Sequence, residues 1–173
     1  DLQLEPGSAD VTDSLALLHR VFGRHPCVVG FGVDAEWYRT KASKDKAGVP
    51  IPDDEARKWM EAVSTLGPSY TLFLKHWRPS HMPPTYRHPR LWFLSDSQQF
   101  RNLEGLLDDF SRWGRAFGRE TVGYQFGYPK DRPWWGKMKR PPREIGEAIR
   151  RRIPNTRWLF WVDFTADAVK FGE

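Results

Sequence analysis

The chain has 173 residues, of which 39% are hydrophobic and 14% aromatic, and its formal net charge is +5. This length suits one domain with a substantial core, so we predict a single domain over residues 1–173. The single cysteine, Cys27, excludes an intramolecular disulfide framework, and we expect its thiol to be buried beside the apolar run that follows. No apolar run reaches about 18 residues, so no transmembrane helix is predicted.

Helical and extended patterns alternate along the chain. Residues 10–22 place Leu15, Leu18 and Phe22 on one helical face, behind residues that can cap a helix. The later pattern predicts strands at 28–36, 70–77, 91–96, 121–128 and 157–164, with helices at 51–66, 102–117 and 141–153 and a proline-rich loop at 78–89. Four of the five strands are nearly continuous apolar runs, which is typical of a parallel sheet covered by helices.

Polar or aromatic side chains follow the end of every predicted strand. Such a gathering is typical of the active-site face of a (β/α) barrel, whereas a doubly wound sheet gathers its site at a switch point. We therefore predict an α/β fold of the parallel TIM-type barrel class. Because a complete barrel has eight strands and this chain opens on a predicted helix, we expect only the last five βα units, with an N-terminal barrel segment missing.

Two acids mark the end of the first predicted strand. The apolar, glycine-bearing run Val28–Val33 leads into Asp34 and Glu36. Side chains alternate along a strand, so both carboxylates are expected on one face. Neighbouring carboxylates in a buried place tend to raise the pKa of one of them, which produces a general acid. We therefore predict an active site here.

This stretch resembles a known family motif. Residues 29–37 read V-G-F-G-V-D-A-E-W, similar to the D-x-x-D-x-D-x-E motif of family 18 glycoside hydrolases, the chitinases and endo-N-acetylglucosaminidases. The final Glu falls on Glu36 and the last Asp on Asp34, while the two earlier Asp positions are Gly32 and Val29. The resemblance implies a glycosidase in which Glu36 is the general acid. Asp34 would orient the substrate's N-acetyl group, which attacks the anomeric carbon in place of an enzyme nucleophile.

The resemblance also implies roles for later strands. Tyr124, as a catalytic residue, or Tyr128 would hydrogen-bond the acetyl oxygen, and Trp161 would lie beneath the sugar. Further strand-end residues are predicted to contact the carbohydrate. This set is Lys75, Trp77, Asp96, Gln98, Gln125, Tyr128, Trp161 and Asp163.

Other interpretations stay open. Asp34 and Glu36 could instead form structural ion pairs with Lys75 or Arg39, and His76 is expected to have a supporting rather than a catalytic role. A second function is a metal-dependent phosphodiesterase-type barrel, in which oxygen ligands and His76 bind Mg²⁺ or Ca²⁺. Its ligands would be drawn from Asp34, Glu36, Asp96, Asp163 and His76. A third is a sugar-binding barrel without catalysis.

For the preferred function we expect a carbohydrate partner and neither a metal nor a cofactor. The sequence has no zinc-ligand spacing, phosphate-binding loop or dinucleotide fingerprint. The basic segment 130–152 is interpreted as a solvated helix face with its loops, so a nucleic-acid partner is not expected. The compartment is left open.

Overall fold

The computed structural model describes residues 1–44, 46–118 and 122–169. The strands are β1 (Leu2–Leu4), β2 (Gly30–Asp34), β3 (Thr71–Lys75), β4 (Leu91–Ser95), β5 (Val122–Phe126) and β6 (Thr156–Trp161). The α-helices are α1 (Val11–Phe22), α2 (Asp53–Leu66), α3 (Leu103–Ala116), α4 (Arg132–Trp135) and α5 (Pro141–Arg152). Residue 121, at the start of one predicted strand, lies outside the described residues.

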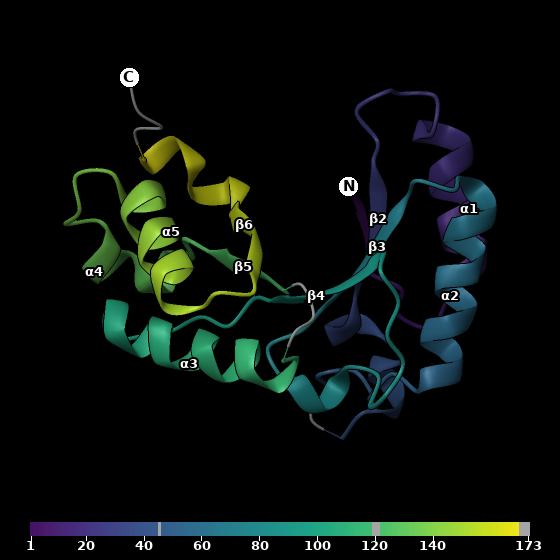
Figure 1. Cartoon of the computed structure of the whole chain (residues 1–173), viewed down its shortest axis with the longest axis horizontal. Coiled ribbons are helices and arrows are strands. Elements are labelled where there is room, and N and C mark those ends of the chain that lie inside the picture. Colours follow the sequence, from purple (N-terminus) through teal and green to yellow (C-terminus); the bar gives the residue numbers. More distant parts are fainter. Residues whose placement is uncertain (45, 119–121, 170–173) are drawn as a thin grey trace. The chain divides into compact units, whose positions relative to one another are not determined.

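The strands form one parallel sheet in the order β1-β2-β3-β4-β5-β6, and helices alternate with them along the chain (Figure 1). The α/β class and the parallel sheet are therefore confirmed. β3 and β4 are joined by a loop with one 3₁₀ turn, at Pro79–His81, as the proline-rich segment indicated. The count of five strands and the helical start were wrong, because β1 precedes α1. A strand of three residues is too short for an alternating pattern to reveal it.

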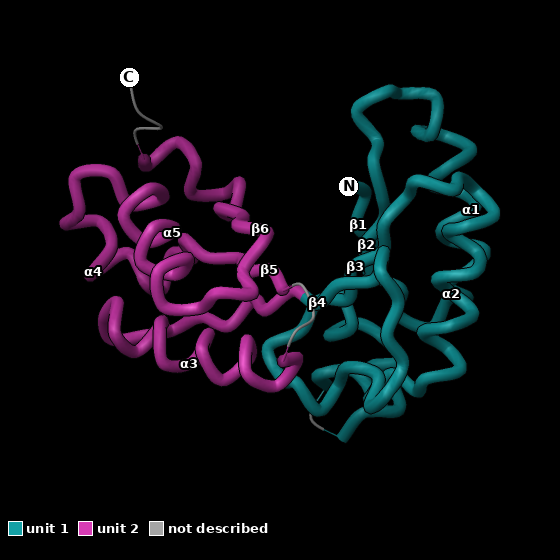
Figure 2. Tube along the Cα trace, in the orientation of Figure 1, with its two compact units in different colours: residues 1–93 teal, residues 94–173 magenta. Residues whose placement is uncertain are grey.

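The chain divides into two compact units, residues 1–93 and 94–173, with the boundary inside β4 (Figure 2). Whether they act as one domain stays a prediction. No helix in the described ranges is long and apolar enough to cross a membrane.

In the 1–93 unit, α1 and α2 cover one face of the strands (Figure 1). Phe31 and Val33 of β2 and Leu72 and Leu74 of β3 are fully buried there. The Asp10 side chain accepts the Asp13 N–H at 3.1 Å, so Asp10 is the residue that caps the N-terminus of α1. Cys27 lies exposed in the loop after α1, which corrects the expected buried thiol.

The opposite face of β2 carries Gly30, Gly32 and Asp34. A Cβ built on Gly32 would lie 1.9 Å from the ring of Phe73 on β3, so the glycine makes room for that ring. Phe73 in turn lies beside Trp92 of β4, with ring centroids 4.9 Å apart. The glycine in this strand therefore reflects close packing of a large aromatic side chain.

In the 94–173 unit, α3 and α5 pack together and cover one face of β5 and β6. Tyr124 of β5 stacks on Phe110 of α3, with centroids 4.5 Å apart, and its hydroxyl donates to the Phe110 carbonyl at 2.9 Å. Burial raises the pKa of Tyr124. Leu159 of β6, paired with Tyr124 in the register, contacts the α5 backbone at Gly146. This face is therefore the helix-covered side of both strands.

Gly32→Ala should destabilise the fold by about 1–3 kcal/mol, because the added methyl group must displace the buried Phe73 ring. Gly105→Ala on α3 is the matched control, since its Cβ would meet only the Asn102 oxygen at 3.5 Å. Urea denaturation measures both variants. Equal effects of the two substitutions would contradict the proposed packing.

Folding should depend on alkaline pH through Tyr124. An unfolded tyrosine ionises near pH 10, whereas the buried folded one retains its proton, so stability is full below about pH 10 and falls as the pH rises further. Tyr124→Phe should lose less stability than the wild type between neutral and strongly alkaline pH in denaturant titrations. An identical loss in both proteins would show that Tyr124 is not the responsible group.

Candidate functional site

Asp34 and Glu36 lie where β2 turns into the 3₁₀ turn Ala35–Trp37. The Asp34 carboxylate caps this turn by accepting the Glu36 N–H at 3.2 Å. The expectation that both residues lie on one extended strand was therefore wrong, because the strand ends at Asp34. Their carboxylate oxygens nevertheless lie within 4.8 Å of each other, so the turn achieves the predicted pairing by another route.

Asp34 forms a buried ion pair with Lys75. The Lys75 Nζ lies 2.8 Å from Asp34 Oδ2, with the two side chains only 9% and 3% exposed. The register places these residues opposite each other at the ends of β2 and β3, and Gln3 of β1 donates to the same oxygen at 3.4 Å. Three adjacent strands thus position one carboxylate. We call Asp34, Glu36, Lys75 and Gln3 the carboxylate site.

Aromatic residues flank this site along the chain. Glu36 is half-buried, and the next residue, Trp37, is 47% exposed. Trp77 comes two residues after Lys75, beyond the end of β3, and is half-buried under the Arg78 guanidinium, 5.3 Å from its ring. The sequence interpretation missed Trp37, although its place directly after the two acids was the available signal.

His76 has a structural position, as expected. Its ring is completely buried, its Nδ1 accepts the Arg78 N–H at 2.8 Å, and its Nε2 lies 2.8 Å from the Ala47 carbonyl. The accepting Nδ1 assigns the proton to Nε2, which gives the neutral ring. The ring therefore ties the loop after β2 to the end of β3.

Of the two ion-pair partners considered for the acids, the structure uses Lys75 for Asp34. Arg39 pairs instead with Glu55 of α2, at 3.5 Å. Arg39 also lies 5.0 Å over the ring of Tyr38, and burial raises the pKa of the Tyr38 hydroxyl.

The two residues after β4 that were predicted to contact the carbohydrate differ in burial. Asp96 is buried, whereas Gln98 is exposed. β4 ends at Ser95, so strand alternation does not place the two on a common face.

Two residues assigned to the site by resemblance lie in the helix-covered layer of the 94–173 unit. The Tyr124 hydroxyl is engaged by α3, as described above. Trp161 packs edge-on against Phe126 and against Trp135 of α4, with centroids 5.6 and 5.1 Å apart. The register pairs Trp161 with Phe126, on the same side of the sheet as Tyr124. We therefore do not retain Tyr124 or Trp161 as substrate contacts.

Gln125 and Tyr128 form a polar pair at the end of β5. Gln125 Nε2 donates to the Tyr128 hydroxyl at 2.6 Å, and alternation places Gln125 on the face away from the helices. Asp163 is exposed and its carboxylate accepts the neighbouring Phe164 N–H at 2.9 Å. Gln125 and Tyr128 thus contact each other, while the Asp163 carboxylate binds the adjacent backbone; a carbohydrate contact of these three residues stays a prediction.

One buried acid was missed. Asp131 is only 2% exposed and accepts the Phe100 N–H at 2.6 Å, which holds the segment after β4 against the segment after β5. Burial raises the pKa of Asp131, and hydrogen bonds from the backbone oppose this. In the sequence, Asp131 stands in the basic segment 130–152, which was interpreted as solvated, so no buried acid was predicted there.

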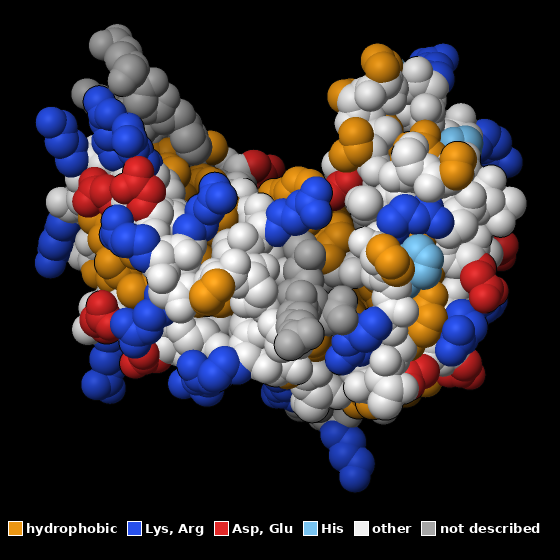
Figure 3. Space-filling view, in the orientation of Figure 1, with side chains coloured by type: hydrophobic (Ala, Val, Ile, Leu, Met, Phe, Trp, Pro, Cys, Tyr) orange, Lys and Arg blue, Asp and Glu red, His pale blue; other side chains and the backbone are white. Residues whose placement is uncertain are grey.

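The surface of the 94–173 unit carries charges of both signs. On the face of the 94–173 unit seen in Figure 3, Lys and Arg side chains stand beside Asp and Glu side chains. Arg143 and Glu147 of α5 are such a pair, at 2.8 Å.

No family model matches the chain, and no curated protein or solved structure matches it either. The function is therefore inferred from the sequence resemblance together with the contacts of the described residues.

Lys75→Met should destabilise the protein by about 3 kcal/mol, because it leaves the buried Asp34 carboxylate without its cation. The double variant Asp34→Asn, Lys75→Met should recover most of this loss. Lys58→Met is the control, since Lys58 pairs with Asp10 at the surface and should matter little. Additive effects of the single substitutions at Asp34 and Lys75 would contradict the coupling.

Proposed function

We propose that this chain is a glycoside-hydrolase-like protein that acts on an N-acetylated carbohydrate at the carboxylate site, with Glu36 as the general acid. The observation that carries the proposal is the pair of carboxylates within 4.8 Å, one of which, Asp34, is held buried by Lys75. The sequence resemblance to family 18 glycoside hydrolases supplies the chemistry, and the geometry is compatible with it.

We further propose that the fold is of the (β/α) barrel type. The strand order β1-β2-β3-β4-β5-β6 supports this, because consecutive parallel neighbours are the barrel arrangement and a doubly wound sheet reverses its order at a switch point. The carboxylate site then lies at the carboxyl ends of the strands, where barrel enzymes carry their chemistry.

In the proposed reaction, the Glu36 carboxylic acid gives its proton to the glycosidic oxygen as the bond from that oxygen to the anomeric carbon breaks. The acetamido oxygen of the substrate forms the new bond to the anomeric carbon. The resemblance assigns Asp34 to the acetamido N–H, and this hydrogen bond requires the Asp34 carboxylate to exchange one of its present donors, Lys75, Gln3 or the Glu36 N–H. Water then opens the cyclic intermediate, and Glu36 takes back a proton from that water.

The chain lacks two Asp positions of the family motif, and the structure explains the consequence of one of them. The inner Asp position is Gly32, and the Phe73 ring fills the space where a side chain would begin. A proton relay through an inner carboxylate is therefore not part of the proposal. Lys75 and Gln3 fix the orientation of Asp34 instead.

Trp37 and Trp77 are proposed as sugar-contacting surfaces. Both follow the strand ends that carry the carboxylate site, and aromatic rings offer apolar faces on which sugar rings stack. This places carbohydrate contacts on segments that are already exposed or half-buried.

The metal-dependent alternative is less compatible with these contacts. The Lys75 ammonium group lies 2.8 Å from the Asp34 oxygen, so a divalent cation would have to displace it. Both nitrogens of His76 already have partners. Asp34 already accepts from Lys75, Gln3 and the Glu36 N–H. A carboxylate engaged in this way favours a second function, a sugar-binding protein without catalysis.

Glu36→Gln tests the catalytic role. On N-acetylglucosamine oligosaccharides, the substitution should lower turnover by at least about 100-fold while sugar binding is retained, because the amide cannot donate the proton. Glu61→Gln, an exposed acid on α2, is the matched control and should leave turnover unchanged. Product formation is followed by release of reducing ends and binding by calorimetry.

Each outcome decides between functions. Full turnover by Glu36→Gln would remove Glu36 as the acid. Sugar binding by the wild type without any turnover would establish the non-catalytic function, and in that case Trp37→Ala should weaken the binding. Neither binding nor turnover would overturn the carbohydrate proposal.

A further inference from the structure

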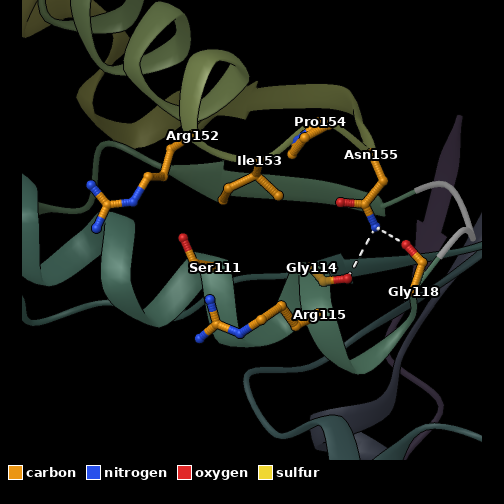
Figure 4. Close-up of a pocket in the computed structure, with 8 residues that line it drawn as sticks. All are labelled: Ser111, Gly114, Arg115, Gly118, Arg152, Ile153, Pro154 and Asn155. Atoms are coloured by element: carbon orange, nitrogen blue, oxygen red, sulfur yellow. Dashed lines mark hydrogen bonds between the residues drawn. The ribbon is translucent and has the colours of Figure 1, made fainter.

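A cavity lies within the 94–173 unit, at the edge where β6 begins. It has a volume of about 340 Å³ and lies between α3 and the segment that joins α5 to β6 (Figure 4). Its apolar wall includes Ile153 and Pro154, in the short segment between α5 and β6. The cavity therefore belongs to the amino-terminal edge of β6 and has no part in the carboxylate site.

A buried hydroxyl group points into this cavity. Ser111 of α3 is 8% exposed, and its Oγ has no hydrogen-bond partner among the described residues. Figure 4 shows this oxygen directed toward the space between Ile153 and the two arginines. A buried hydroxyl without a partner is destabilising, so a ligand that accepts a hydrogen bond from it would recover that free energy.

Two guanidinium groups flank the hydroxyl, and they differ in whether an acid pairs with them. Arg152 pairs with Asp108 at 3.0 Å and with Glu104 at 3.5 Å, so its charge is neutralised by α3. Arg115 has no ion pair within the part of the chain that the structure describes. Among the described residues, the cavity therefore has one arginine without an ion pair, which matches a ligand with a single negative charge.

The backbone carbonyl groups near the cavity limit the negative charge that a ligand can carry. Asn155 donates its amide to the carbonyls of Gly114 and Gly118, at 3.0 Å each, and thereby closes the carboxyl end of α3 (Figure 4). The carboxyl ends of both α3 and α5 meet here, and helix carboxyl ends carry partial negative charge. This disfavours a doubly charged phosphate.

We propose that this cavity binds a small monocarboxylate with an apolar body. The Arg115 guanidinium would form a bidentate pair with the carboxylate, the Ser111 hydroxyl would donate to it, and Ile153 and Pro154 would contact the apolar part. The volume lies at the small end of ordinary ligand pockets, which suits a ligand of one ring or a short branched chain. This inference is independent of the proposed glycosidase activity.

Benzoate is the probe, used with the whole chain in amide NMR titrations. Saturable shifts are expected at Ser111, Gly114 and Ile153. Arg115→Gln should weaken benzoate binding about tenfold, and Ser111→Ala should weaken it by a smaller factor. Arg112→Gln is the matched control, because Arg112 lies on the same helix but pairs with Asp109 and does not line the cavity.

Neutral benzamide and inorganic phosphate test whether the cavity recognises the charge of benzoate or its shape. Benzamide should bind about tenfold more weakly than benzoate, and phosphate should produce weaker shifts than benzoate. Equal binding of benzamide, an unchanged affinity in Arg115→Gln, or no shifts with millimolar benzoate would overturn the proposal. Tighter binding of phosphate would overturn the choice of a carboxylate.

Discussion

The buried ion pair between Asp34 and Lys75 is the interaction on which the candidate site depends. Removing two charges from water costs several kcal/mol for each ion, and only close geometry with further hydrogen bonds offsets that cost. Here the separation is 2.8 Å, and Asp34 also accepts hydrogen bonds from Gln3 and from the N–H of Glu36. A carboxylate held by so many partners has one orientation, which is what a positioning group requires.

The packing of β2 against β3 explains how this ion pair forms. Gly32 leaves room for the Phe73 ring, and two residues further along the strands the register brings Asp34 opposite Lys75. Both charged side chains are buried, and the low local dielectric of a buried place strengthens the attraction between the charges. The glycines and the acids of this segment are therefore parts of one arrangement.

Much of the fold could be predicted from the sequence, because long apolar strands and capped amphipathic helices are local signals. The helix at Val11–Phe22, with its Asp10 cap, and the apolar strands are of this kind. β1 was missed because three residues carry too little pattern. The 3₁₀ turn at Ala35–Trp37 was missed because Asp34 ends the strand by capping the turn, a contact that alternation does not reveal.

The candidate site was predictable where neighbouring strand ends bring residues together, as for Asp34, Glu36 and Lys75. The site was not predictable where tertiary packing decides whether a side chain is buried or accessible. Tyr124 is polar and follows the expected motif order, but its hydroxyl bonds to α3 and its ring stacks on Phe110. Asp131 looked like one charge among many, and only the fold shows that it is buried.

The central claim is that the carboxylate site cleaves a glycosidic bond with help from the substrate's own acetamido group. The most direct test is proton NMR of the anomeric signals during hydrolysis of an N-acetylglucosamine oligosaccharide with β linkages. Participation of the acetamido oxygen predicts that the β anomer appears first, because two displacements at the anomeric carbon retain its configuration. First appearance of the α anomer, or no product at all, would contradict the account.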